Sequence, residues 1–116
     1  MENNLKSLDL TNLREITLGN SETEALLFPA FIDVAAKAII NLQKSLEKNQ
    51  ETLWHEQAHF LRGSSANIGA RRLAFLCGVA EEKYQTDKAE KLLLLKNIEE
   101  EFRLVKGLLE AEKKSS

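Results

Sequence analysis

The sequence predicts an all-α protein, an antiparallel four-helix bundle with a short extra helix at the N-terminus. Glycine and proline are scarce, with 5 and 1 among 116 residues, and a chain rich in Leu, Ala, Glu and Lys favours helices over strands. Apolar residues recur at spacings of three and four, and no segment alternates with the period of two that marks a half-buried strand. Short connections between the periodic segments favour antiparallel neighbours.

Length, composition and charge limit the classes of protein that this chain can represent. A chain of 116 residues predicts one domain, 1–116, with its core at about 9–112. The net charge of -2, with both signs mixed along the chain, predicts no nucleic-acid partner. The apolar runs are shorter than a membrane span, the N-terminus lacks the core of a signal peptide, and the single Cys77 has no partner for a disulfide. We therefore expect a cytoplasmic protein with no membrane partner.

The first two helices are predicted from apolar spacing and capping residues. Residues 9–17 form a short helix with three apolar residues on one side, namely Leu10, Leu13 and Ile16. Ser21 followed by Glu24 fits a capping box for the next helix. That helix has apolar residues at alternating spacings of four and three: Phe28, Ile32, Ala35, Ile39, Leu42 and Leu46. Because an interior proline costs about 3 kcal/mol, we expect the helix to kink at Pro29 or to start near it.

The third helix should run from about Glu51 to Ile68 and stop at Gly69. At about 100° per residue, one arc of about 80° holds the residues that should face the core, namely Trp54, Ala58, Leu61, Ser65 and Ile68. His59 falls on roughly the opposite side. A fourth helix should start near Ala70 or Arg71, and Asp87 with Glu90 should cap the last one. The pattern therefore places the His59 imidazole in water on the flank of the bundle.

The neighbours of His59 on this exposed face indicate a site. Gly63 lies one turn further along, although a mid-helix glycine costs roughly 1 kcal/mol relative to alanine. A reason to accept that cost is access, because a glycine lets a bulky partner reach the ring. Arg62 places a positive charge beside any phosphate there. A histidine with an ordinary pKa is mostly neutral near pH 7, so its ring nitrogen can attack an activated phosphoryl group.

The same region resembles the signature of histidine phosphotransfer (HPt) domains, which typically reads A-H-x-L-K-G-S-S-x-x-x-G. The matching residues are the run from Ala58 to Ala70, followed on the next helix by Leu73, Cys77 and Glu81. The resemblance implies that His59 is the phosphoacceptor, through its Nε2 atom. It also implies that Arg62 stabilises the phosphoryl charge where the family usually has lysine, that Gly63 gives clearance, and that Ser65 supports the local backbone.

The function that the resemblance implies is a step in a two-component phosphorelay. His59 would accept a phosphoryl group from a receiver-domain aspartate and pass it to another receiver aspartate. The implied partners are receiver domains of response regulators and a hybrid sensor histidine kinase, and the chain itself would have no autokinase activity. We expect a monomer with no cofactor or metal of its own, since the Mg²⁺ would belong to the receiver. Docking would be weak and would use an apolar patch around His59 with a charged rim.

Two other functions are consistent with parts of the sequence. Residues 55–59 read H-E-x-x-H, which on a helix can place two zinc ligands one turn apart, with Glu81 or Glu82 as a third ligand. This pattern fixes only three positions, and the sequence shows no strand of the kind that usually borders the cleft of a zinc-dependent hydrolase. A non-catalytic helical docking module is the second alternative. We interpret His55 as a bystander on the exposed face rather than as a second phosphorylation site.

Overall fold

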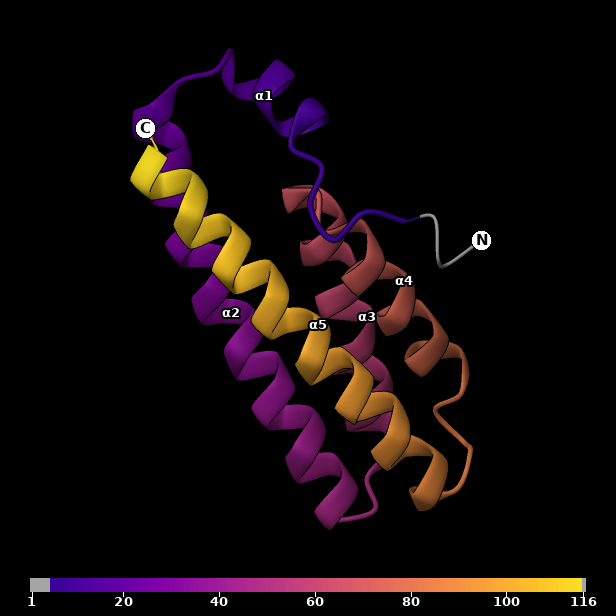
Figure 1. The fold of residues 1–116 in the computed structure, drawn as a ribbon. Helices are drawn as coiled ribbons and strands as arrows, with labels where there is room; N and C mark the ends of the chain where they lie inside the picture. The colour runs from indigo at the N-terminus through magenta and orange to yellow at the C-terminus, as the bar shows by residue number, and fades with distance from the viewer. Residues whose placement is uncertain (1–4, 116) are drawn as a thin grey trace.

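The computed structural model describes residues 5–115, and the side chains of residues 5–112, and this part of the chain is helical without a strand. The helices are α1 (Thr11–Thr17), α2 (Ser21–Glu47), α3 (Glu51–Ile68), α4 (Arg71–Glu82) and α5 (Lys88–Ser115). Contacts join α2 to α3, α3 to α4, α4 to α5 and α5 to α2, which closes a four-helix bundle. Figure 1 shows α2 and α5 side by side, with α1 beyond the end where α5 stops and α2 starts. The predicted fold class is confirmed.

The core of the bundle is built from one apolar stripe on each long helix. All five residues of the predicted arc on α3 are buried, so the assignment of its inner face is confirmed. They pack with fully buried side chains of the other helices, among them Leu42, Leu73, Cys77, Ile98, Val105 and Leu109. Since full burial of one such apolar side chain contributes about 1.5–3 kcal/mol, this core fixes the rotation of α3 and with it the direction of its outer face.

The start of α2 differs from the prediction. The helix begins at Ser21 and continues through Pro29, so of the two alternatives at the proline, a kink or a start nearby, the start near Pro29 is wrong. Its N-cap is Asn20 rather than Ser21, because the Asn20 Oδ1 atom accepts a hydrogen bond of 3.0 Å from the backbone N–H of Thr23. The interior proline removes one backbone donor and costs about 3 kcal/mol. Burial of Phe28 and Phe31 on either side of it offsets that cost.

Length and composition alone would let α2 cross a membrane, since it holds a window with a mean hydropathy of 1.7. The expectation that every apolar run is too short for a span is therefore wrong for this helix. The core helix of a soluble bundle passes the same test, and α2 contributes buried residues from Phe28 to Leu46 to the core. The test is thus weak evidence for a membrane partner.

The N-terminal segment lies across the turn between α3 and α4. The backbone N–H of Asp9 donates to the Gly69 carbonyl at 2.8 Å, and the N–H of Arg72 donates to the Lys6 carbonyl at 3.1 Å. Gly69 has a φ of +92°, which a glycine at the end of a helix adopts without strain. In α1 the expected apolar face is only partly correct, because Ile16 remains 80% exposed while Leu13 is buried.

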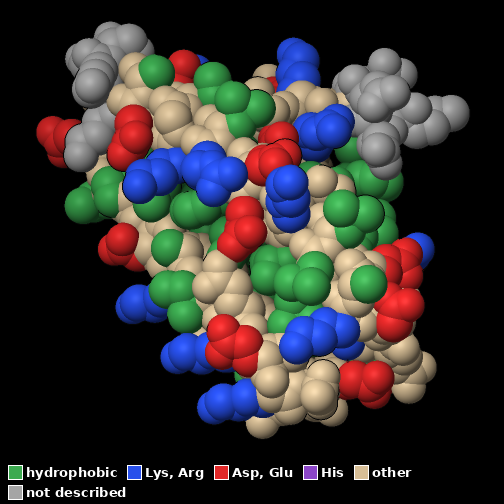
Figure 2. Space-filling model, turned by 60° about the horizontal axis from the view of Figure 1, so that its bottom comes forward, with side chains coloured by type: hydrophobic (Ala, Val, Ile, Leu, Met, Phe, Trp, Pro, Cys, Tyr) green, Lys and Arg blue, Asp and Glu red, His purple; other side chains and the backbone are tan. Residues whose placement is uncertain are grey.

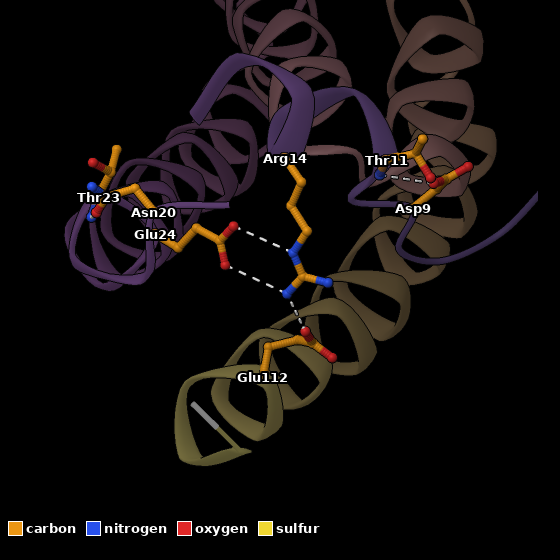
Figure 3. A network of polar contacts seen from close by, with 7 residues as sticks. All are labelled: Asp9, Thr11, Arg14, Asn20, Thr23, Glu24 and Glu112. Atoms are coloured by element: carbon orange, nitrogen blue, oxygen red, sulfur yellow. Dashed lines mark hydrogen bonds and ion pairs between the residues drawn. The ribbon is translucent and has the colours of Figure 1, made fainter. Parts of the chain in front are cut away.

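A charged network fastens α1 to the two longest helices (Figure 3). The Arg14 guanidinium donates to the Glu24 carboxylate at 3.3 and 3.4 Å and to the Glu112 carboxylate at 2.5 Å. Glu112 and Glu24 together raise the pKa of Arg14, so this side chain stays charged over the whole working pH range. The network joins α1, α2 and α5 at the end of the bundle.

Candidate functional site

The His59 side chain stands on the outer face of α3 and is 63% exposed. It lies near the middle of an 18-residue helix whose opposite face is buried. The outward direction expected from the helical wheel is therefore confirmed. A ring in this position can be reached by another protein without any opening of the bundle.

Glu81 on α4 fixes the orientation and the tautomer of the His59 ring. The His59 Nδ1 atom lies 2.8 Å from the Glu81 Oε2 atom, and the Glu81 side chain is only 13% exposed. An ionised carboxylate can only accept a hydrogen bond, so the proton of the neutral ring belongs on Nδ1. The Nε2 atom then carries a free lone pair. The sequence marked Glu81 as part of the motif and as a possible third zinc ligand. It gave no sign of a direct hydrogen bond between Glu81 and His59, since the two residues lie on different helices.

Two more cationic or titratable side chains share the same carboxylate. The Arg62 Nη1 atom lies 3.2 Å from Glu81 Oε1, and the His55 Nε2 atom lies 3.8 Å from Glu81 Oε2. The His55 ring also packs edge-on against Tyr84, with 4.8 Å between the ring centroids. We call His55, His59, Arg62 and Glu81 the Glu81 cluster. In the structure His55 lies at the edge of this cluster rather than apart from it.

Glycine and serine near His59 have different surroundings. A Cβ atom built at Gly63 would meet no atom within 4 Å, so none of the described residues requires glycine there. A Cβ at Gly78 would lie 3.3 Å from the Arg62 Cδ atom, so this glycine on α4 makes room for the stem of Arg62. Ser65 is fully buried, and within the described residues its Oγ atom has no hydrogen-bond partner, so it fills space in the core.

Trp54 ties α3 to α4 next to the cluster. Its indole N–H donates to the Ala80 carbonyl oxygen at 2.8 Å, and the Lys91 ammonium lies 5.4 Å from the ring centroid. Ala80 directly precedes Glu81, so this bond fixes the position of Glu81 along α3 relative to His59. The sequence predicted Trp54 as a core residue, and it is buried, but its hydrogen bond depends on the packing of two helices and leaves no trace in the sequence.

The surface beside the cluster combines apolar and basic groups. Phe60, next to His59, and Phe75 on α4 are both partly exposed. A groove of about 630 Å³ lies under the N-terminal segment and is lined by Arg62, Ala66 and Phe75, among others. On the face in Figure 2, hydrophobic side chains alternate with acidic and basic ones, and no histidine is visible among the described residues.

The zinc interpretation of residues 55–59 is not supported. His55, His59 and Glu81 do lie near one another, as that interpretation requires. Within the described residues, however, no group of three or more His, Cys, Asp or Glu side chains could hold a metal ion. The Nδ1 atom of His59 is instead bound to Glu81 directly.

Comparisons with known proteins agree with this geometry. The family model described as Hpt domain matches residues 27–112. Among solved structures, the chain is similar to the crystal structure of histidine-containing phosphotransfer protein B (HptB) from Pseudomonas aeruginosa PAO1, with a TM-score of 0.83 and 25% identity over 95% of this chain and 96% of that one. A search of proteins with curated functions finds no significant match.

Proposed function

The chain belongs to the Hpt domain family and is a histidine phosphotransfer protein of a phosphorelay, and we propose that His59 is the residue that carries the phosphoryl group. Proteins of this family are phosphotransfer intermediates rather than classical enzymes, and they interact with receiver and kinase domains. The proposal for His59 is supported by one observation above all. The ring is exposed, and its Nδ1–H is bound to Glu81, which leaves the Nε2 lone pair directed away from the carboxylate.

The chemistry requires little else from this chain. The Nε2 lone pair attacks the phosphorus of a receiver aspartyl phosphate, the N–P bond forms, and the P–O bond to the aspartate breaks. No general base is needed, because the attacking nitrogen carries no proton. The product ring is a phosphoimidazolium whose charge the Glu81 carboxylate offsets. Transfer to the next receiver reverses these steps, with positioning and charge neutralisation as the main contributions.

We further propose that the partner supplies the remaining components. A receiver domain would bring Mg²⁺ and the acidic pocket, and this chain would need no cofactor and have no autokinase activity. Docking would use Phe60 and Phe75 as apolar contacts near His59, while Gly63 leaves space for the receiver loops. An interface of this kind is small and transient, as a shuttle between receivers requires.

The test of the phosphoacceptor is labelling by a receiver that carries radioactive phosphate. Wild-type protein should become labelled, and the label should be labile in acid and stable in base, as expected for phosphohistidine. His59→Gln should lose the label completely while its circular dichroism and melting temperature stay unchanged, since the side chain is exposed. His55→Gln is the matched control, because it removes the other histidine of the same face. Labelling of His59→Gln at the wild-type rate would exclude His59.

A further inference from the structure

In the Glu81 cluster one carboxylate, that of Glu81, faces one guanidinium, that of Arg62, and the rings of His55 and His59. The Arg62 Nη1 to Glu81 Oε1 distance of 3.2 Å is an ion pair, but its geometry is not that of a hydrogen bond, and Glu81 Oε1 is buried without a hydrogen-bond partner among the described residues. Because this oxygen is buried, Arg62 can leave it only when another cation takes over the charge of the carboxylate.

Phosphorylation changes the charges in this cluster. When Nε2 bonds to phosphorus, the ring gains a positive charge, with its proton still on Nδ1 at 2.8 Å from Glu81. The phosphoryl group brings a new negative charge to the solvent side of the ring. The anions are then Glu81 and the phosphoryl group, and the cations are Arg62 and the phosphorylated ring. The cation nearest to Glu81 is the ring itself. The cation left for the phosphoryl group is Arg62, at position i+3 on the same helix.

The surroundings of Arg62 allow such a movement. Its side chain is 46% exposed, and its stem rests against Gly78 on α4 without being enclosed. The space over Gly63, one residue further along α3, is open. The guanidinium can therefore swing from α4 towards the outer side of His59 without displacing any packed side chain.

We propose that Arg62 has two positions: it pairs with Glu81 while His59 is unmodified, and it moves to the phosphoryl group when His59 is phosphorylated. In the second state the Glu81 carboxylate is left to the phosphoimidazolium ring. Arg62 thus acts as an exchangeable counterion, and Gly78 is the positioning residue that seats it in the resting state. This inference rests on the proposed role of His59 as phosphoacceptor.

The test uses phosphoramidate, a small phosphoryl donor that needs no partner protein and releases ammonia when its P–N bond breaks. The side-chain Nε–H signal of Arg62 is followed by NMR before and after phosphorylation. In the wild type it should shift on phosphorylation. In Glu81→Gln the signal of the unmodified protein should already differ from the wild type, because the resting partner has lost its charge. The phosphorus signal of the phosphohistidine should differ between the wild type and Arg62→Gln.

Labelling rates and the conservative variant Arg62→Lys distinguish the proposed exchange of Arg62 from a purely structural role of this residue. Arg62→Gln should be labelled by phosphoramidate about tenfold more slowly, and Arg62→Lys should recover most of that loss. Gly78→Ala presses only on the flexible Arg62 stem, so it should move the Arg62 signal of the unmodified protein. An Arg62 signal that is identical in both states of labelled wild-type protein would overturn the exchange. Failure of His59 to be labelled at all would instead refute the proposed function.

Discussion

The backbone at Gly69 gives the clearest quantitative test of how the N-terminal segment is held. A Cβ atom at this position would lie 2.1 Å from the carbonyl oxygen of Asp9, and the residue has a φ of +92°. An alanine here must both adopt a left-handed conformation and displace a backbone carbonyl, which has no flexible end that could give way. The N-terminal segment therefore has to leave its place across the turn between α3 and α4.

The cost of Gly69→Ala follows from the contacts that are lost. A left-handed conformation costs an alanine roughly 1–2 kcal/mol. The hydrogen bonds from Asp9 N–H to Gly69 and from Arg72 N–H to Lys6 contribute about 1 kcal/mol each. The free energy of unfolding should therefore fall by about 3 kcal/mol, which corresponds to a drop of roughly 10 °C in melting temperature for a chain of this size.

Urea unfolding and hydrogen exchange measure this change and locate it. The amides of Asp9 and Arg72 should lose their protection in Gly69→Ala, while those in the middle of α3 should keep theirs. Gly107→Ala is the matched control, because a Cβ there meets no described atom within 4 Å and the residue lies inside α5. That variant should be more stable by about 0.5–1 kcal/mol. A loss of less than 1 kcal/mol in Gly69→Ala, with full protection of Asp9, would refute the reasoning.

Four further outcomes follow from the structure. Gly63→Gln should slow phosphoryl transfer from a receiver at least tenfold by steric blocking, whereas Gly107→Gln should leave the rate unchanged; equal rates in both variants would remove the role of clearance. Trp54→Phe should cost about 1–3 kcal/mol in urea unfolding and also slow transfer, since it removes the hydrogen bond next to Glu81; an unchanged transfer rate would separate this bond from the site. Arg14→Ala should cost about 1 kcal/mol and expose α1 to proteolysis, and a resistant α1 would show that its apolar contacts suffice. Burial raises the pKa of the Cys77 thiol, so the native protein should resist alkylation at pH 8 until urea unfolds it; rapid native reaction would contradict its core position.

The faces of the helices could be predicted from the sequence because they depend on spacing alone. In α3 a period of 3.6 residues separates Trp54, Leu61 and Ile68 from His59, and the structure keeps that separation. The N-cap of α2 was misplaced by one residue, since Asn20 and Ser21 are both good capping residues and only the backbone conformation decides between them. Helix propensity also failed at Pro29, where burial of the neighbouring apolar side chains outweighs the cost of an interior proline.

The Glu81 cluster could be predicted only in part, because it joins residues from two helices. His59, Arg62 and Gly63 lie on one face of α3, so their proximity follows from the sequence. The contacts of Glu81 with His59 and Arg62 depend on how α4 is rotated and shifted along its axis relative to α3. Core packing and the hydrogen bond from Trp54 to Ala80 set this arrangement. The turn at Gly69 contributes as well, since it holds the N-terminal segment over the start of α4.

With His59 as the proposed phosphoacceptor, the arrangement explains how a small bundle can carry a reactive phosphoryl group without a pocket of its own. A pocket would be needed to activate a protonated nucleophile, but here the proton already lies on Nδ1, where the Glu81 carboxylate holds it. The exposed Nε2 atom can therefore enter the active site of either a donor or an acceptor, and the same geometry serves both directions of transfer. Enclosing His59 in the bundle would protect the phosphohistidine but would exclude the receivers. The carboxylate holds the ring from its inner side, and the open space over Gly63 leaves the outer side accessible to the receivers.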